Sequence, residues 1–408
     1  MNIIDYVKNK NATFKAAPFN NVDALLFCQV FYAKVEVQIR DGAVVPGPEG
    51  VPLKEFYRAE YFPQMFGDGM TDHENELLFT AMCASPRFRD VRIKNIETDL
   101  DEESEKQFAA ATFVLDDRTE FVAFRGTDGS MLGWKEDFNM AFMDEVPSQK
   151  AAAAYLNRYY GPDGQGQDKR IYVGGHSKGG TLAVYGSLKA GPAVRARLIT
   201  VFSLEGPGFR DEVFQRLRAI EEAEGIRVIK IVPQASLVGM LMETQGKVLV
   251  VEAKAFGPMQ HSAFTWQIEG DDFRYTELSN AGDFNKRVLH RWLERVSDEE
   301  RALFVDRLFD LLFDNDIRSV SDIRRIGPSK VREVLESFSG MDEGSRQTMQ
   351  NVLLQLGASA VQNIPSEDLR NAFDSIHNWY RESFGSTDGQ RTENRVENRA
   401  SDERGVEE

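Results

Sequence analysis

The residues best suited to chemistry are a serine and the glycines around it, in the run GGHSKGG at residues 174–180. An apolar, strand-like segment precedes this run, and a helix-like segment follows it. A serine on a sharp strand-to-helix turn exposes its hydroxyl, and flanking glycines let the strand and helix pack closely around it. The amide of Lys178 then lies at a helix N-terminus, where it can donate to an oxyanion. The pattern predicts Ser177 as a catalytic nucleophile.

A serine is a poor nucleophile without a base, so the five histidines are the next candidates. They are His73, His176, His261, His290 and His377. His261 lies in a loop after the last long strand-like segment, where the chain order serine, acid, histidine of α/β-hydrolases places the base. His176 is expected to pack beside the serine, and the other three fall near a helix start or in helical segments.

The third member of such a triad is an acid that orients the imidazole and stabilises its charged form. Glu205 ends the strand-like run RLITVFSLE, between Ser177 and His261. The next strand-like run ends in IVPQASLVGM, which offers only Ser236 at the corresponding place. Asp271 and Asp272 are the alternative acids, but they follow His261 in the chain. The sequence therefore favours Glu205.

The second oxyanion donor should come from the loop after an earlier central strand, here FVAFRGTDGS. Thr127 in this loop can offer its amide and its hydroxyl, beside the amide of Lys178. Arg125 is expected to hold the loop by charge-assisted hydrogen bonds. Trp134 and Asp137 either anchor the same loop or lie on a helix face.

The elements that position these residues alternate between strand and helix. Strand-like runs occur at 91–100, 108–117, 120–128, 170–175, 197–205, 227–232 and 247–253, and helix-like runs at 150–160, 178–189 and 212–224. Such alternation predicts an α/β fold with a mainly parallel sheet covered by helices on both faces.

Three regions follow from this pattern. Residues 1–280 are predicted to form the α/β-hydrolase domain, with helices at 21–36 and 71–83. Within it, 41–70 is rich in proline, glycine and aromatic residues, which suits either a lid or a plain connector. From about residue 270 the pattern is helical: 281–385 is predicted as a helical extension and 386–408 as a disordered polar tail. The chemistry is not expected to need the residues beyond about Asp298.

Composition excludes several functional classes. The chain has 408 residues with 42% hydrophobic residues, enough for one large domain and a smaller one. Its 49 Lys and Arg against 65 Asp and Glu give a net charge of −16, which argues against nucleic-acid and anionic-membrane surfaces. Two cysteines, Cys28 and Cys83, exclude a disulfide framework or a cysteine zinc site and are expected to be buried. No apolar run is long enough to cross a bilayer, so we expect a cytoplasmic protein. We also expect neither a metal nor a cofactor.

The motifs together resemble an uncharacterised bacterial α/β-hydrolase family related to the class 3 (fungal-type) lipases. The resemblance covers roughly residues 1–275 and rests on 13–32, Phe124–Thr127, Trp134, Asp137, Gly175–Gly180, Glu205–Phe209, Val232-Pro233, Ser236, Val238-Gly239, His261-Ser262 and Trp266. It implies a serine hydrolase with a site of the acyl-ester type. Two departures concern the acid: class 3 lipases carry an aspartate where this chain has Ser236, and Glu205 stands where an aspartate is expected.

The sequence thus predicts hydrolysis of an acyl or lipid-like ester through Ser177, His261 and Glu205 and an acyl-enzyme intermediate. The same triad also serves peptidases and thioesterases. The rival from another class is a noncatalytic scaffold or partner-binding protein, with the helical C-terminal region as a candidate docking surface. The segment IRRIGPSKVREVLESF faintly resembles a helix-hairpin-helix DNA module, but it has one glycine where that hairpin has two, and the chain is acidic.

Overall fold

The computed structural model describes residues 1–67, 69–255, 257–280 and 295–325, together with residues 282, 287, 293, 330, 333, 334, 337 and 344. These residues all belong to one compact unit, Met1–Gln355. The predicted tail and most of the predicted helical extension lie outside the described residues.

A nine-stranded sheet forms the centre of the described fold, in the order β1-β2-β3-β4-β5-β6-β7-β8-β11. Its strands are β1 (Val51–Pro52), β2 (Arg92–Asp101), β3 (Lys106–Val114), β4 (Thr119–Phe124), β5 (Arg170–His176), β6 (Leu198–Leu204), β7 (Val228–Pro233), β8 (Lys247–Val251) and β11 (Tyr275–Thr276). The strands from β4 to β8 are parallel, whereas β1 to β4 and the β8–β11 pair are antiparallel. The sheet is therefore mixed rather than mainly parallel, because the short β2–β3 and β3–β4 turns permit only hairpins.

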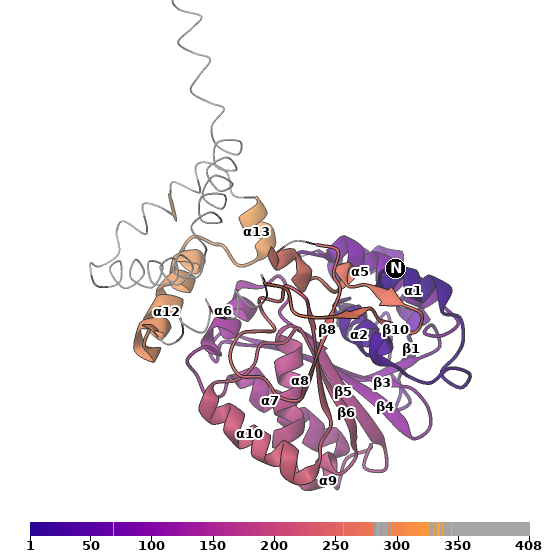
Figure 1. The fold of residues 1–408 in the computed structure, drawn as a ribbon. Helices are drawn as coiled ribbons and strands as arrows, with labels where there is room; N and C mark the ends of the chain where they lie inside the picture. Colours follow the sequence, from indigo (N-terminus) through magenta and orange to yellow (C-terminus); the bar gives the residue numbers. More distant parts are fainter. Residues whose placement is uncertain are drawn as a thin grey trace, which may run out of the picture. The chain divides into compact units, whose positions relative to one another are not determined.

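Helices cover both faces of this sheet (Figure 1). One face carries α1 (Ile3–Asn9), α2 (Asn21–Val30) and α5 (Asp72–Ala84), and the other carries α7 (Pro147–Tyr160), α8 (Lys178–Lys189) and α10 (Asp211–Glu224). Alternate residues of β4 divide between the two cores: Phe121 and Ala123 pack on the α2 side, and Val122 and Phe124 on the α8 side. Successive side chains of a strand point to opposite faces, and both faces of this sheet are covered. The central strands are therefore continuous apolar runs in the sequence.

The smaller elements complete the fold. They are α3 (Glu36–Arg40), α4 (Phe62–Met65), α6 (Met131–Asn139), α9 (Pro192–Arg195), α12 (Asp298–Asp314), α13 (Val320–Arg324) and a two-stranded sheet of β9 (Ile268–Glu269) and β10 (Asp272–Phe273). Short strands thus occur after residue 270, where a helical pattern was expected. The helix predicted at 21–36 ends at Val30, and a turn separates it from α3, which begins at Glu36. In the described part of the chain, no helix is long and apolar enough to cross a membrane.

The segment 41–70 packs against the sheet edge that β1 occupies. Leu53, Phe56 and Met65 are buried, and Val51 pairs with Ile93 of β2. Whether this segment moves as a lid or only connects α3 to α5 stays a prediction.

Both cysteines are free and buried, as predicted. Burial raises the pKa of the Cys83 thiol to about 12 and that of Cys28 well above its usual value. Neither thiol therefore ionises at neutral pH.

Candidate active site

Ser177 stands between β5 and α8 with φ 57° and ψ −133°, a conformation that a residue with a side chain rarely adopts. The surrounding hydrogen bonds hold it there: its amide donates to Leu204 O at 3.0 Å, and its carbonyl accepts from the Gly180 amide at 2.8 Å. The strained turn predicted from the glycine pattern is present, and it places Ser177 at the N-terminal end of α8.

Two glycines of the turn are required by close backbone approach. A Cβ on Gly175 would lie 2.1 Å from the carbonyl of Gly179, and a Cβ on Gly179 would lie 2.2 Å from Phe124 O. Helix α8 can therefore begin directly against the ends of β4 and β5 only because both positions lack a side chain.

The predicted base lies beside the serine. His261 Nε2 is 3.0 Å from Ser177 Oγ, the distance of a hydrogen bond. The loop that carries His261 is fixed by its neighbour Gln260, whose carbonyl accepts from the indole of Trp266 and whose side-chain oxygen accepts from the Ala235 amide, both at 2.9 Å. His261 is positioned to remove the serine proton.

His176 supports the loop that carries His261 through a hydrogen bond to its backbone. Its Nε2 lies 3.0 Å from the carbonyl oxygen of His261, and its Nδ1 lies 3.3 Å from the hydroxyl of Tyr32. A carbonyl only accepts, so Nε2 carries the proton and donates. Burial, reinforced by the neighbouring His261, lowers the pKa of His176 to about 3, and the ring stays neutral. The predicted packing residue is thus a neutral support for the base.

Glu205 is the carboxylate that faces the other imidazole nitrogen. Its Oε1 lies 3.8 Å from His261 Nδ1, and its side chain is fully buried. The Ser236 hydroxyl lies 2.9 and 2.8 Å from the two carboxylate oxygens, within donating distance of both. A Cβ on Gly239 would lie only 2.4 Å from Glu205 Oε2, so this loop closes over the carboxylate because it has a glycine there.

The Glu205–His261 distance is that of an ion pair and exceeds that of a hydrogen bond. Among the described residues, His261 Nδ1 has no hydrogen-bond partner and is buried. A shift of the imidazole by about 1 Å would form the bond, and such tightening is common when substrate binds.

The alternative acids are occupied elsewhere. Asp271 is exposed and pairs with Lys10 at 2.5 Å. Asp272 accepts from the hydroxyl of Tyr275 at 2.8 Å. Of the predicted acids, the structure brings Glu205 to the histidine.

The loop predicted to supply the second oxyanion donor lies against the serine. A Cβ on Gly126 would be 3.2 Å from Ser177 Cβ and 2.2 Å from the Tyr32 hydroxyl. The next residue, Thr127, donates its hydroxyl to Asp137 at 2.5 Å. Burial raises the pKa of Asp137 to about 6, although nearby Lys178 and the Thr127 hydrogen bond lower it. Because it accepts the hydrogen bond from Thr127, Asp137 anchors this loop.

The Lys178 side chain is engaged in buried hydrogen bonds with residues other than Ser177. Its ammonium donates at 2.9 Å to Glu136, both groups being inaccessible to solvent, and also to the backbone and side-chain oxygens of Gln107. Gln107 in turn donates to the carbonyl of Gly126 at 3.5 Å. The side chain of Lys178 is structural, whereas its amide lies at the helix start beside the serine.

Arg125 holds the same loop from the other side, as predicted. Its guanidinium donates to Glu36 at 2.6 Å and lies 5.0 Å from the centre of the Phe31 ring. The residues that sequence reasoning missed are Tyr32, Glu136 and Gln107. Their positions carry no local pattern, and only the fold brings them here.

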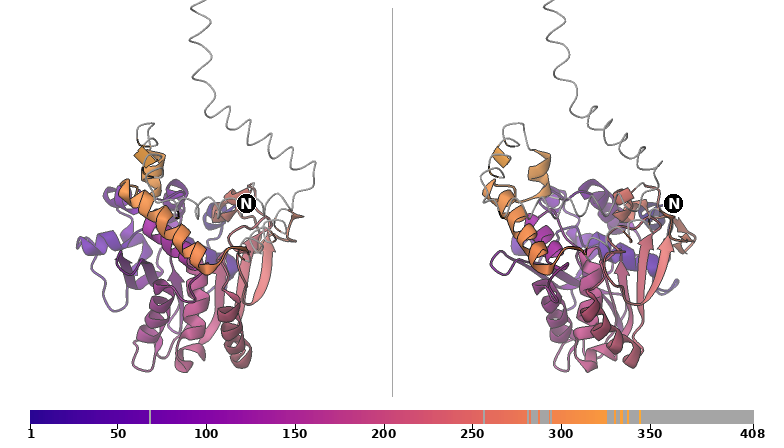
Figure 2. Two further views of the ribbon diagram at one scale, coloured as in Figure 1. Left: turned by 90° about the vertical axis from the view of Figure 1, so that its left-hand side faces the viewer. Right: turned by 60° about the vertical axis from the view of Figure 1, so that its left-hand side comes forward.

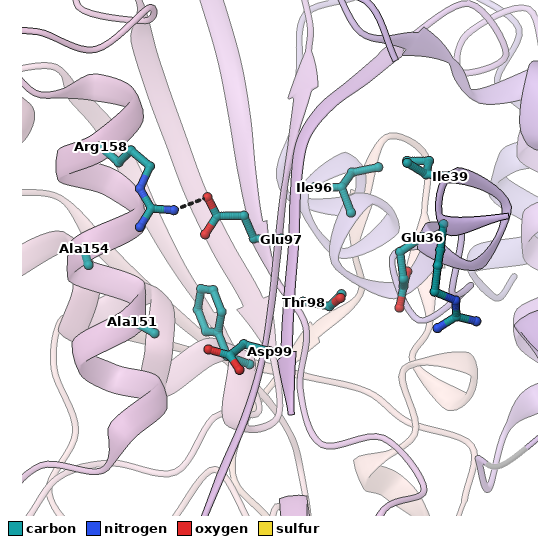
Figure 3. Close-up of a pocket in the computed structure, with 11 residues that line it drawn as sticks. Glu36, Ile39, Ile96, Glu97, Thr98, Asp99, Ala151, Ala154 and Arg158 are labelled. Atoms are coloured by element: carbon teal, nitrogen blue, oxygen red, sulfur yellow. Dashed lines mark hydrogen bonds and ion pairs between the residues drawn. The ribbon is translucent and has the colours of Figure 1, made fainter. Parts of the chain in front are cut away.

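A groove of about 660 Å³ lies near the edge of the sheet and has Glu36, the partner of Arg125, in its lining. Figure 3 shows it along β2, with Glu97 and Arg158 to one side of the strand and Ile96 and Glu36 to the other. Neither Ser177 nor His261 lines it, so the candidate active site is identified by its geometry and not by this groove.

A family model described as Mbeg1-like matches residues 82–310 of this chain. A search of curated proteins finds no match. The mixed sheet with helices on both faces fits an α/β-hydrolase-like fold.

Similar solved structures are fungal lipases at low identity. A fungal lipase–inhibitor complex has 13% identity over 57% of this chain and 80% of that one, with a TM-score of 0.36. Lipase II from Rhizopus niveus has 14% identity over 56% and 78%, with a TM-score of 0.33. The lipase from Rhizopus microsporus var. chinensis has 15% identity over 64% and 83%, with a TM-score of 0.33.

Proposed function

The chain belongs to the Mbeg1-like family, and from its site geometry we propose that it is a serine hydrolase acting on acyl or lipid-like esters. The observation that carries the proposal is the 3.0 Å contact between Ser177 Oγ and His261 Nε2, made by a serine held at φ 57°. A structural serine has no need of a strained backbone beside an imidazole.

The proposed reaction begins when Ser177 Oγ attacks the ester carbonyl and His261 Nε2 takes its proton. Glu205 stabilises the resulting imidazolium. The amides of Thr127 and Lys178 donate to the oxyanion, and the collapse of the tetrahedral intermediate expels the alcohol with the proton from His261. Water then attacks the acyl-enzyme by the same route and releases the acid and free Ser177.

The choice of ester substrates is supported by the motifs shared with the class 3 lipase-related family, and we extend that relation to this chain as part of the proposal. A cytoplasmic setting belongs to it too, in keeping with two unpaired thiols. Thioester and peptide hydrolysis use the same groups. A noncatalytic scaffold is the alternative of a different kind.

Labelling with a fluorophosphonate probe separates a hydrolase from a scaffold, because the probe reacts with an activated serine. We expect labelling and hydrolysis of short p-nitrophenyl esters by the wild type, and a loss of about 10⁴- to 10⁶-fold in kcat for Ser177→Ala. Ser187→Ala on the following helix is the matched control, since its buried hydroxyl has no partner among the described residues. Equal labelling of the wild type and Ser177→Ala would remove the assignment.

A further inference from the structure

The loop that carries Thr127 is bound by a distant part of the chain. After Thr127 the loop continues through Gly129 and Ser130 into α6, and the turn between α12 and α13 lies against it. The Val320 amide donates to Gly129 O at 2.8 Å, and the Met131 amide donates to Arg318 O at 2.8 Å. These two bonds form an antiparallel bridge between Ser130 and Ser319.

Helix α12 packs along α6 behind this bridge (Figure 2). Met131 and Trp134 of α6 share an apolar cluster with residues of α12, among them Phe304 and Phe309. The ammonium of Lys135 on α6 joins this contact by pairing with Asp306 of α12 at 3.0 Å. The bridge therefore belongs to an extended, partly buried interface.

Helix α6 is itself part of the site. It carries Asp137, which holds the Thr127 hydroxyl, and Glu136, which pairs with Lys178 beside the nucleophile. The helix thus has the reacting residues on one side and α12 on the other. Oxyanion donors accelerate a reaction only to the extent that they are held in place before charge develops.

We propose that the turn between α12 and α13 acts as a brace that holds the loop carrying Thr127, here called the oxyanion loop. The Val320 amide and the Arg318 carbonyl are the positioning groups of this brace. This inference rests on the proposed hydrolase function. It makes the chain beyond Asp298 a contributor to the chemistry, in contrast to the sequence-based expectation.

The brace can be tested with proline, which removes the amide proton and places its ring Cδ against the carbonyl oxygen that the proton contacted. Val320 is the first residue of α13 and Met131 the first of α6, where proline is well tolerated. The preceding residues, Ser319 and Ser130, are extended, as a residue before proline must be. Val320→Pro and Met131→Pro therefore each delete one bond of the bridge. Val320→Ala and Met131→Ala are the matched controls, because they shorten the side chain and keep the amide.

We expect each proline variant to raise amide hydrogen exchange across residues 126–133 above that of its alanine control. With p-nitrophenyl esters, kcat should fall about tenfold more in the proline variant than in the alanine variant, with KM little changed. The affinity for phenylboronic acid, which forms a tetrahedral adduct with the serine, should fall in parallel with kcat.

Equal exchange and equal kcat in both proline–alanine pairs would overturn the brace. If KM rose while kcat held, a general loosening of substrate binding would replace it. A wild-type protein that fails to label with a fluorophosphonate would refute the proposed hydrolase, whereas the exchange comparison would still decide whether the bridge holds the loop. The two variants lie on opposite strands of the bridge, so the misfolding of one leaves the other to give the answer.

Discussion

Glu205, the proposed triad acid, lies in an uncommon backbone and side-chain environment. It is a glutamate at φ 53°, fully buried, with Ser236 rather than another acid opposite its carboxylate. A buried carboxylate needs a donor, and the Ser236 hydroxyl provides one. The extra methylene of glutamate then reaches from the end of β6 toward His261.

Glu205→Gln should lower kcat by about 10³- to 10⁴-fold and preserve the fold, because a neutral amide does not stabilise the imidazolium. Steady-state ester hydrolysis and the thermal unfolding midpoint would measure the two effects. Asp271→Asn is the matched control, since that carboxylate pairs with Lys10 at the surface. A large loss of kcat in Asp271→Asn, together with full activity in Glu205→Gln, would assign the triad acid to Asp271 instead.

The junction between strands and α8 shows how an element limits its own sequence. The first turn of α8 runs so close to β4 that Gly179 lies against Phe124 O. Packing this tight lets the helix N-terminus and the strand ends converge on Ser177. The glycines of the run are therefore required by the contact between two elements as well as by the turn.

Gly179→Ala should destabilise the protein by about 2–4 kcal/mol, because its Cβ would lie 2.2 Å from a backbone oxygen that cannot move without its strand. Gly47→Ala is the control: its Cβ meets nothing within 4 Å, and we expect a change of less than about 1 kcal/mol. Urea unfolding monitored by circular dichroism gives both free energies. Equal values for the two variants would show that α8 can shift away from β4.

At the scale of the whole molecule, helix α12 belongs to the same compact unit as the sheet. Its apolar side chains, among them Phe304, Val305 and Phe309, are buried in a cluster with Met131 of α6. An amphipathic helix of this kind is stable only while its apolar face is covered. The helical region predicted as an extension therefore begins as a structural part of the unit that holds the site.

A chain ending at Gln355 should keep its ester hydrolysis, because it retains the whole of the compact unit Met1–Gln355. A chain ending at Ser297 should unfold at a lower temperature and lose activity, since it exposes the apolar face of α6. Differential scanning fluorimetry and p-nitrophenyl ester turnover measure the two properties. Full activity in the shorter chain would show that α12 is dispensable.

The local pattern of the sequence was sufficient for the central strands and helices and for the candidate site residues. Glycine spacing predicted the turn at Ser177, and strand–helix alternation predicted the central strands β4 to β8, because backbone sterics and the two-residue period act within a few residues. Chain order then selected His261 and Glu205 for the roles that the structure's geometry supports.

Tertiary structure decided what depends on pairs of residues far apart in the chain. The Tyr32 and His176 support of the base, the buried pair of Lys178 and Glu136, and the Val320 bond to the oxyanion loop join segments that no local pattern links. A hydrogen bond or ion pair between distant segments leaves no periodic trace in either of them, since each residue is chosen by its partner in space. The physical reason is that periodicity records which face of an element is buried, whereas the partner on that face is set by packing alone.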